Sequence, residues 1–204
     1  MEQVQVITHV MEPVLPGTHT VVTVAGASKE THVYATPLEN RPSRCPGDGA
    51  TREHRGMLEL PIAQRTGECL TVEIPAVVYS VWAFHLEPRL DPDFTTVNAP
   101  RLDWAFPSHA APGEELRLQG RSLVSADHYP TADPAQPVSF GGLLEGCTRV
   151  VAKRVGENRY IDIPVACSSA YEARCQVPAD LPEGEYDVYA HNGLGGAYGW
   201  SPAL

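Results

Sequence analysis

The sequence of 204 residues lacks the common signatures of a catalytic or metal-binding protein. It contains no Gly-x-Ser-x-Gly motif, which a serine hydrolase places between a strand and a helix. None of its five cysteines forms a Cys-x-x-Cys pair, and its eight histidines show no ligand spacing, which disfavours zinc-ribbon and thioredoxin-like sites. With 25 acidic residues, no carboxylate pair stands out as a glycosidase acid and nucleophile. We therefore assign no catalytic residue.

Three other absences bear on partners and location. The formal net charge is −10, with acidic and basic residues mixed along the chain, whereas a nucleic-acid-binding surface is normally basic. No apolar run approaches the roughly 20 residues that span a bilayer. The first residues, Met1-Glu-Gln-Val-Gln-Val, lack the basic region, apolar core and cleavage site of a signal peptide. We expect neither nucleic acid nor a membrane as a partner.

The odd number of cysteines leaves at least one thiol outside any intrachain disulfide. Cys167 and Cys175 flank a short loop and form one candidate pair, and Cys45 with Cys69 forms a second. Free thiols at all these positions are an equally open alternative, because pairing depends on geometry and on the redox compartment.

Proline and glycine, by contrast, are abundant, with 19 and 17 residues, and they bound many short apolar segments. Such punctuation is typical of short strands joined by tight turns. The pattern predicts strands at residues 4–10, 18–25, 31–36, 57–60, 70–74 and 77–86, and again at 115–119, 138–140, 149–155, 160–165, 172–177 and 185–191. Only residues 143–147 could form a short helical turn.

This pattern predicts an all-β fold of two β-sandwich domains. Residues 1–87 form the N-terminal sandwich, residues 88–100 a proline-rich linker, and residues 101–204 the second sandwich. Gly120 follows an alternating segment and is expected to mark a β-bulge or a strand end. The hydroxyl of Tyr186 is expected to bond back across the preceding turn, as in a tyrosine corner.

Two polar or glycine-rich loops are candidate binding sites. Residues 125–137 contain Asp127 and Asp133, which could bind a structural calcium ion together with neighbouring carbonyl oxygens. A solvated loop without metal is the favoured interpretation, so we expect no cofactor. Residues 193–199 are rich in glycine but miss the G-x-G-x-x-G spacing of a phosphate loop, which favours a simple turn after an edge strand.

The second half resembles a TIG-type immunoglobulin-like domain. The motifs that carry the resemblance are Trp104-Ala-Phe-Pro-Ser-His-Ala-Ala-Pro-Gly113, Leu116-Arg-Leu-Gln-Gly120-Arg-Ser-Leu123 and Val177-Pro-Ala-Asp-Leu-Pro-Glu-Gly-Glu-Tyr186. In such domains a proline-glycine turn, a strand and a glycine open the sandwich, and a Gly-x-Tyr turn closes it. The resemblance implies two immunoglobulin-like β-sandwich domains.

The closing segment His191-Asn-Gly-Leu-Gly-Gly-Ala-Tyr-Gly-Trp-Ser201 carries a second resemblance. It is similar to the segment by which paired β-sandwich domains precede a right-handed β-helix in bacterial proteins of the pectate-lyase superfamily. The stacked repeats of the β-helix do not occur in this sequence, so no catalytic residue of that superfamily can be carried over. The resemblance implies a secreted or cell-surface protein whose downstream partner is a catalytic β-helix domain.

Aromatic residues supply the candidate ligand-binding positions. A sugar ring presents an apolar face of C–H bonds that stacks on Trp or Tyr, while its hydroxyls hydrogen-bond to polar side chains. The candidates are Trp104, Trp200, Tyr198, Asn192, His191 and Trp82. The alternative for each tryptophan is burial in a core or at a contact between domains, where aromatic side chains are common.

Together with the aromatic candidates and the lack of a catalytic motif, the two resemblances imply a non-catalytic carbohydrate-binding or accessory module of a polysaccharide-active bacterial protein, with a polysaccharide or oligosaccharide as partner. Two alternatives stay open. The chain is a fragment of, or is itself, a polysaccharide-cleaving glycoside hydrolase or lyase, or it is a purely structural docking domain. Release of reducing sugar would indicate the enzyme, and a gain in stability with a neighbouring segment would indicate docking.

Overall fold

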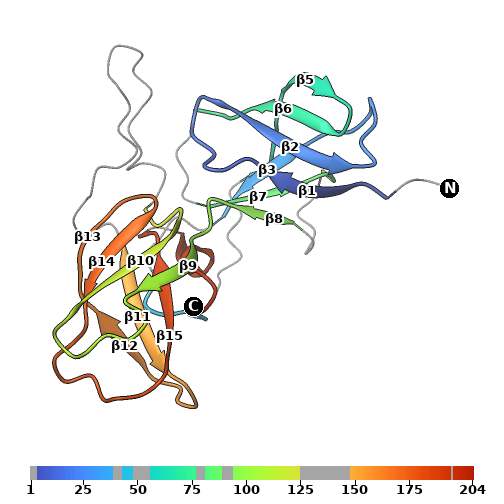
Figure 1. Cartoon of the computed structure of the whole chain (residues 1–204). Coiled ribbons are helices and arrows are strands. Elements are labelled where there is room, and N and C mark those ends of the chain that lie inside the picture. The colour runs from blue at the N-terminus through green and yellow to red at the C-terminus, as the bar shows by residue number, and fades with distance from the viewer. Residues whose placement is uncertain are drawn as a thin grey trace, which may run out of the picture.

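The computed structural model describes residues 4–38, 43–47, 56–76, 81–88, 94–124, 148–193 and 195–204 of the chain. Within these ranges the chain forms fifteen strands, one 3-10 turn (η2, Gly196–Gly199) and no α-helix. The strands make four antiparallel sheets, which lie in two lobes (Figure 1). Strands β1 to β8 build one lobe and strands β9 to β15 the other. The predicted all-β fold class is confirmed.

In the first lobe two four-stranded sheets face each other across a common core. Their strand orders are β1 (Val6–Val10), β2 (His19–Ala25), β6 (Cys69–Glu73), β5 (Ile62–Thr66) in one sheet and β4 (Leu58–Glu59), β3 (Tyr34–Pro37), β7 (Trp82–His85), β8 (Thr95–Val97) in the other. Strand β2 shows the period of two expected for a strand with one buried face, since Val22 and Val24 are buried between partly exposed neighbours. They share a core cluster with Trp82 and Phe84 of the opposite sheet.

The second lobe is a smaller sandwich. One sheet, called the β9 sheet below, has the order β13 (Val165–Ser168), β14 (Glu172–Gln176), β10 (Glu115–Arg121), β9 (Arg101–Phe106). The other, called the β11 sheet, has the order β12 (Tyr160–Ile163), β11 (Arg149–Arg154), β15 (Tyr186–His191). Leu118 and Ala173 from the β9 sheet pack with Val150, Ala152 and Ala190 from the β11 sheet. Strand β15 lies at one end of the β11 sheet, and the 3-10 turn η2 that follows it agrees with the expected glycine-rich turn after an edge strand.

Strand β8 lies inside the segment that the sequence predicts to be a linker. Thr95–Val97 pairs with β7, where Val97 is the partner of Trp82. Only residues 98–100 therefore separate the last strand of the first sandwich from β9. The sequence pattern does not reveal β8, because a strand of three residues is too short to show a period of two.

The predicted strand at residues 160–165 is in fact two strands, β12 and β13. Pro164 separates them, and proline has no amide hydrogen with which to continue a ladder. The chain passes there from the β11 sheet to the β9 sheet. Strand β5 is missed by the pattern because it is an edge strand whose residues are almost all exposed. The predicted strand at 138–140 and helical turn at 143–147 lie outside the described residues.

Two local predictions can be compared directly with the structure. The Tyr186 hydroxyl donates a hydrogen bond of 2.7 Å to the carbonyl oxygen of Pro182, which confirms the tyrosine corner. Neither candidate disulfide forms, because Cys45, Cys69, Cys167 and Cys175 are all free thiols. Burial raises the pKa of the Cys175 thiol to about 12, so it stays protonated and unreactive at neutral pH. Cys147 lies outside the described residues.

Gly120 marks the expected bulge. The register between β9 and β10 shifts between Gln119 and Gly120, and Gly120 lies opposite Leu102. A Cβ atom on Gly120 would lie 1.9 Å from the carbonyl oxygen of Arg101, which belongs to the backbone and cannot move as a side chain can. The sandwich therefore requires glycine at this position.

We expect Gly120→Ala to lower the free energy of unfolding by about 3 kcal/mol or more, because the β9 backbone has to move away from β10. Urea unfolding of the purified variant measures this loss. Gly184→Ala is the matched control: its Cβ would meet the Arg154 side chain at 2.7 Å, and that side chain is flexible enough to yield. Equal losses for the two variants would contradict the backbone clash.

Candidate functional site

The structure places the six predicted ligand-binding residues at three separate locations. Trp82 is 2% exposed and belongs to the core of the first sandwich. His191, Asn192 and Trp200 are buried, and Tyr198 is half-buried, all in the segment after β15. Trp104 on β9 is 52% exposed. A ring stacks on a sugar only where its face is open, so Trp104 is the candidate that a ligand can reach in this structure.

The buried group lies where the two sandwiches meet. The indole nitrogen of Trp200 donates a hydrogen bond of 2.9 Å to the Ser43 hydroxyl, across 157 positions of the chain. Arg149 on β11 donates a hydrogen bond of 3.2 Å to the Ser43 carbonyl oxygen. Ser43 comes from the polar segment after β3 of the first sandwich and is itself buried. Residues of the first half thus bind directly to the second sandwich.

His191 supports Trp200 in this junction. The centres of the two rings are 4.8 Å apart. The amide of Gly193 donates to Nδ1 of His191 at 3.0 Å, so Nδ1 is an acceptor and the ring proton lies on Nε2. Nε2 then donates to the carbonyl oxygen of Gly196 at 2.8 Å. Both ring nitrogens are satisfied in the neutral form, and a charged ring would lose the bond to Gly193.

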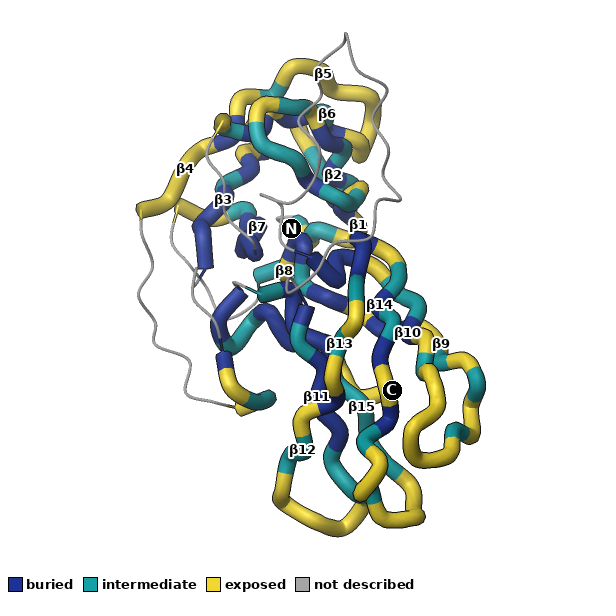
Figure 2. The backbone as a smooth tube through the Cα atoms, turned by 90° about the vertical axis from the view of Figure 1, so that its left-hand side faces the viewer, coloured by how far each residue is buried: buried dark blue, intermediate teal, exposed yellow. Residues whose placement is uncertain are grey.

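Asn98 and Asn192 link the two sandwiches at a second point. The Asn98 side chain makes two hydrogen bonds with the backbone of Val14, at 2.9 and 2.7 Å. The backbone carbonyl oxygen of Asn98 accepts a bond of 3.4 Å from the side-chain amide of Asn192. The carboxylate of Glu12 also lies 3.6 Å from Arg121 of the second sandwich. Val97 at the end of β8 and Asn98 and Pro100 after it are buried, and Figure 2 shows buried segments near β8, where the lobes meet.

Burial lowers the pKa of His191, an effect that nearby Arg149 reinforces and the bond to Gly196 opposes. The ordinary pKa of histidine is about 6.5, so the unfolded chain takes up this proton before the folded protein does as the pH falls. We therefore expect neutral His191 to make its full contribution to the free energy of unfolding above about pH 6.5. Below that pH the free energy of unfolding should decline.

Urea unfolding at several pH values, compared between the wild type and His191→Gln, isolates this contribution from that of other titrating groups. As the pH falls below the histidine pKa, the free energy of unfolding should decline less steeply in the variant than in the wild type. Identical slopes in the two proteins would contradict the expected role of His191 at the junction.

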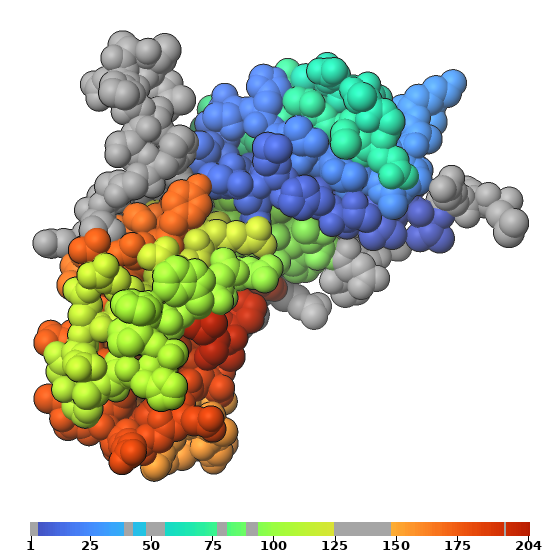
Figure 3. All heavy atoms as spheres, in the orientation of Figure 1, coloured from blue at the N-terminus to red at the C-terminus, as the bar shows by residue number. Residues whose placement is uncertain are grey.

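The outer face of the β9 sheet presents a different surface, which we call the Trp104 face. It comprises Trp104, Phe106, Glu115, Arg117, Gln119, Glu172 and Arg174. Leu118 and Ala105 point into the core, so their neighbours on β9 and β10 point outward. Trp104 and Phe106 are 52% and 62% exposed on the edge strand. The atoms of β9 and β10 accordingly form part of the visible surface of the second lobe in Figure 3.

The strand register places these side chains in two rows across the sheet. Trp104 lies opposite Gln119, which lies opposite Glu172. Phe106 lies opposite Arg117, which lies opposite Arg174. Each aromatic ring on the edge strand is thus followed by planar polar groups on the two inner strands. Directly opposite residues of an antiparallel pair have Cβ atoms about 5 Å apart, so each row is continuous.

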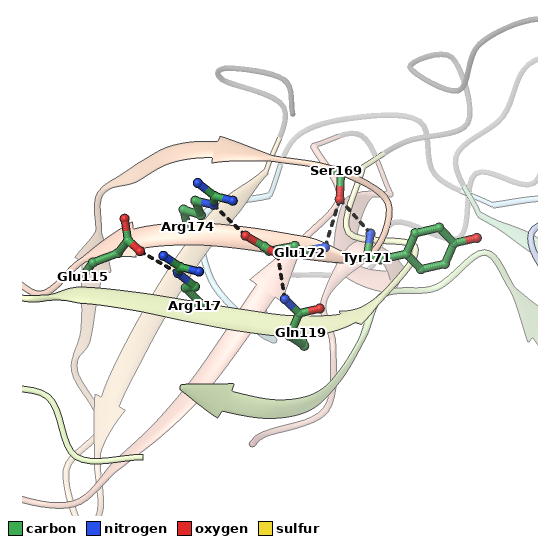
Figure 4. A network of polar contacts seen from close by, with 7 residues as sticks. All are labelled: Glu115, Arg117, Gln119, Ser169, Tyr171, Glu172 and Arg174. Carbon is green, nitrogen blue, oxygen red and sulfur yellow. Dashed lines mark hydrogen bonds and ion pairs between the residues drawn. The ribbon is translucent and has the colours of Figure 1, made fainter. Parts of the chain in front are cut away.

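The polar groups of the Trp104 face hold one another in place, as Figure 4 shows. Arg117 donates from Nε to Glu115 at 2.6 Å, and Arg174 donates from Nε to Glu172 at 2.6 Å. Gln119 donates to the second carboxylate oxygen of Glu172 at 2.8 Å. The Ser169 hydroxyl accepts a bond of 3.0 Å from the backbone amide of Glu172. The side chains are therefore oriented before any ligand arrives.

One carboxylate of this face does not suit the general-acid step of glycoside cleavage. The hydrogen bond from Arg174 holds the pKa of Glu172 below its usual range, so Glu172 stays ionised and cannot serve as a general acid.

The described residues contain no cluster of three or more His, Cys, Asp or Glu side chains that could hold a metal ion. Asp127 and Asp133 lie outside the described residues, so the calcium site stays a prediction. The parts of the chain with a described structure also include no helix that is long and apolar enough to cross a membrane.

Sequence reasoning named Trp104 as a candidate but did not name the side chains around it, which are Phe106, Glu115, Arg117, Gln119, Glu172 and Arg174. The alternation around Leu116 and Leu118 already indicated that Arg117 and Gln119 point outward. The pairing of β10 with β14, more than fifty residues later in the chain, has no comparable signal in the sequence.

Comparison with known proteins gives a distant likeness to multidomain β-sandwich structures. No family model and no curated protein matches the chain. One similar solved structure is a protein crystallised with a xylogluco-oligosaccharide, with 14% identity over 95% of this chain and a TM-score of 0.40. A second is SGBP-B from a complex xyloglucan utilization locus in Bacteroides uniformis, with 15% identity over 99% of this chain and a TM-score of 0.30. A third is the surface glycan-binding protein PbSGBP-B from Prevotella bryantii, with 14% identity over 94% of this chain and a TM-score of 0.32.

The chain spans 39%, 49% and 41% of the lengths of these three structures, in the same order. Their TM-scores and identities are too low to transfer a site or a ligand to this chain. The β-sandwich architecture rests on the sheets described above, and the function has to come from the geometry of the Trp104 face and of the junction.

Proposed function

We propose that this chain is a non-catalytic carbohydrate-binding module and that the Trp104 face is its glycan-binding surface. The observation that carries the proposal is the exposed pair Trp104 and Phe106 beside an ordered row of arginine, glutamine and glutamate side chains. In folded proteins large aromatic side chains bury most of their surface, so two exposed rings on one strand edge require a reason.

The two kinds of group on this face match the two kinds of surface on a sugar. The faces of Trp104 and Phe106 can cover the apolar C–H side of a pyranose ring and remove that surface from water. The guanidinium groups of Arg117 and Arg174 offer donors, and Glu172 offers carboxylate acceptors, to the hydroxyls around the rim of the ring. Hydrogen bonds to charged groups are the stronger kind, so they can orient a sugar on a flat surface.

A sugar fits this face better than a protein partner does. The core of a protein interface is depleted of charged residues and rich in contiguous apolar area. Here the two rings stand at an edge, next to four charged side chains that are already paired with one another. A protein surface would have to bury those ion pairs, whereas a glycan leaves them partly hydrated and adds hydroxyl partners.

The resemblance of the closing segment His191–Ser201 to the one that precedes a β-helix in bacterial pectate-lyase-superfamily proteins supports the finer part of the proposal. On that resemblance, the module would lie next to a polysaccharide-active domain of a bacterial surface or secreted protein. The Trp104 face would then hold the polysaccharide near that partner. The calcium site at Asp127 and Asp133 plays no part in this proposal.

A structural docking or spacer role is the second candidate, and the junction favours it. Trp200, Ser43, Asn98 and Asn192 fix one sandwich against the other through hydrogen bonds that are largely buried. A chain of sandwiches joined in this way holds its ends at a constant distance. This role and glycan binding use different residues, so the same molecule can have both.

Affinity electrophoresis through gels that contain single soluble polysaccharides tests the proposed function. The panel comprises xyloglucan, mixed-linkage glucan, galactomannan, arabinoxylan, polygalacturonate and alginate, with pull-down on cellulose and chitin. We expect selective retardation by at least one glycan, and its loss in the double variant Trp104→Ala, Phe106→Ala. Equal migration of the wild type and the double variant in every gel would overturn the proposal and leave the docking role.

A further inference from the structure

We infer that the glycan bound by the Trp104 face is uncharged, that is, a neutral polysaccharide rather than a polymer of uronic acids. This inference rests on the proposed function and narrows it to one chemical class. Two arginines on one sheet face would ordinarily indicate an anionic ligand. Here the arrangement of the neighbouring carboxylates removes that indication, as the contacts below show.

The two arginines lie directly opposite each other. Arg117 on β10 is the register partner of Arg174 on β14. Like charges at directly opposite positions of a sheet repel each other. Each is compensated on the face itself, because Glu115 contacts Nε of Arg117 and Glu172 contacts Nε of Arg174, both at 2.6 Å. Two carboxylates thus balance two guanidinium groups, and the face carries no net charge.

This compensation leaves little attraction for an added carboxylate. A guanidinium binds a carboxylate best through two parallel hydrogen bonds. Glu115 and Glu172 already occupy the Nε donors, so the side-on edge of each guanidinium is taken and an added carboxylate is left with the end-on edge alone. A uronate would approach close to these glutamates, and the repulsion between carboxylates would offset its attraction to the arginines. The whole chain adds a formal net charge of −10, which disfavours the approach of a polyanion.

The hydrogen-bond donors that remain on this face suit the hydroxyl groups of a neutral sugar. The terminal amino groups of Arg117 and Arg174 have no hydrogen-bond partner among the described residues. They point from an exposed sheet face, where they can donate to neutral sugar oxygens without a change in charge pairing. The neighbouring rings of Trp104 and Phe106 add stacking, which depends on the C–H face of the sugar and not on its charge.

Binding to one neutral glucan and to polygalacturonate, measured by affinity electrophoresis over a range of salt concentrations, tests the inference. We expect retention by the neutral polymer to change less than about twofold between roughly 50 and 500 mM salt, because no ion pairs form on binding. We expect polygalacturonate to retain the chain at least about tenfold more weakly at the lowest salt.

A matched pair of variants tests the role of compensation. Glu115→Gln leaves the charge of Arg117 unbalanced, so this variant should gain retention by polygalacturonate that fades with added salt. Glu157→Gln makes the same charge change at the Arg154–Glu157 pair beyond β11, away from the face, and should show no such gain. Equal gains in both variants would show an effect of net charge alone and would overturn the inference.

The outcomes separate the inference from the proposed function. Retention by the neutral polymer without salt dependence supports both. Stronger, salt-sensitive retention by polygalacturonate, lost in Trp104→Ala, would overturn the neutral class while leaving glycan binding at this face intact. No retention by any polymer would overturn the proposed function itself.

Discussion

Trp104→Ala is expected to weaken binding of the retained glycan by about 30-fold or more, which corresponds to about 2 kcal/mol. Trp104 carries the larger of the two exposed aromatic ring systems on the face, and tryptophan is the kind of residue that dominates binding energy. Because the side chain is 52% exposed, its removal should change the free energy of unfolding by less than about 1 kcal/mol. Isothermal titration calorimetry gives the change in affinity directly.

The control for Trp104→Ala is Val155→Ala. Val155 is also an exposed apolar side chain, at 56%, but it follows β11 and lies outside the Trp104 face. Its removal should leave the affinity unchanged within about twofold. A glycan that binds Trp104→Ala as tightly as the wild type, with Val155→Ala also unchanged, would contradict the assignment of the site.

Trp200→Ala is expected to lower the free energy of unfolding by about 3–5 kcal/mol. Trp200 is 8% exposed, packs against His191 with the two rings tilted, and donates to Ser43. The variant therefore loses packing at the junction and leaves the buried Ser43 hydroxyl without its donor. Urea unfolding monitored by circular dichroism measures the loss. A decrease below about 1 kcal/mol would contradict the role of Trp200 as a structural link.

Trp200→Phe separates the two contributions of this residue. Phenylalanine keeps a ring against His191 but cannot donate to Ser43, so a loss of about 1–2 kcal/mol is expected. Ser43→Ala should cost a similar amount and should add little to Trp200→Phe, because both changes remove the same hydrogen bond. Full additivity of the two losses would show that this bond is not formed.

Trp104 is exposed and Trp200 is buried, and this difference shows what the sequence can and cannot reveal. Both follow or precede glycine- or proline-rich turns, and residue type alone made both candidates for a ligand while leaving burial at a domain contact as the alternative for each. Their exposure depends on which strand and which lobe lie above them, and that is set by contacts across 157 positions in the case of Trp200 and Ser43. Tyr186 was predictable because its partner, Pro182, is only four residues away.

The sandwich architecture itself was predictable from local signals. Leu116 and Leu118 alternate with charged or polar neighbours, and prolines and glycines mark most strand ends, so the all-β class needs no long-range information. The paired rows of the Trp104 face are different. They require β10 to lie between β9 and β14, with a bulge at Gly120 that decides which residues face outward. A shift of one residue would turn Trp104 into the core.

The junction and the Trp104 face give the chain two separable properties. One fixes the relative position of two sandwiches, and the other leaves an ordered, charge-balanced surface open on the second. Variants at Trp200 should therefore act on stability, and variants at Trp104 on binding. This separation is what a module that holds a polysaccharide next to a neighbouring domain requires.

Quenching of tryptophan fluorescence by acrylamide tests the central claim most directly. Trp82 and Trp200 are buried at 2% and 8% exposure, so Trp104 is the tryptophan that the quencher reaches. Saturation with the retained neutral glycan should protect Trp104 and reduce the quenching constant to nearly that of Trp104→Phe. Saturated binding with an unchanged quenching constant would contradict the claim, because the glycan would then lie elsewhere on the molecule.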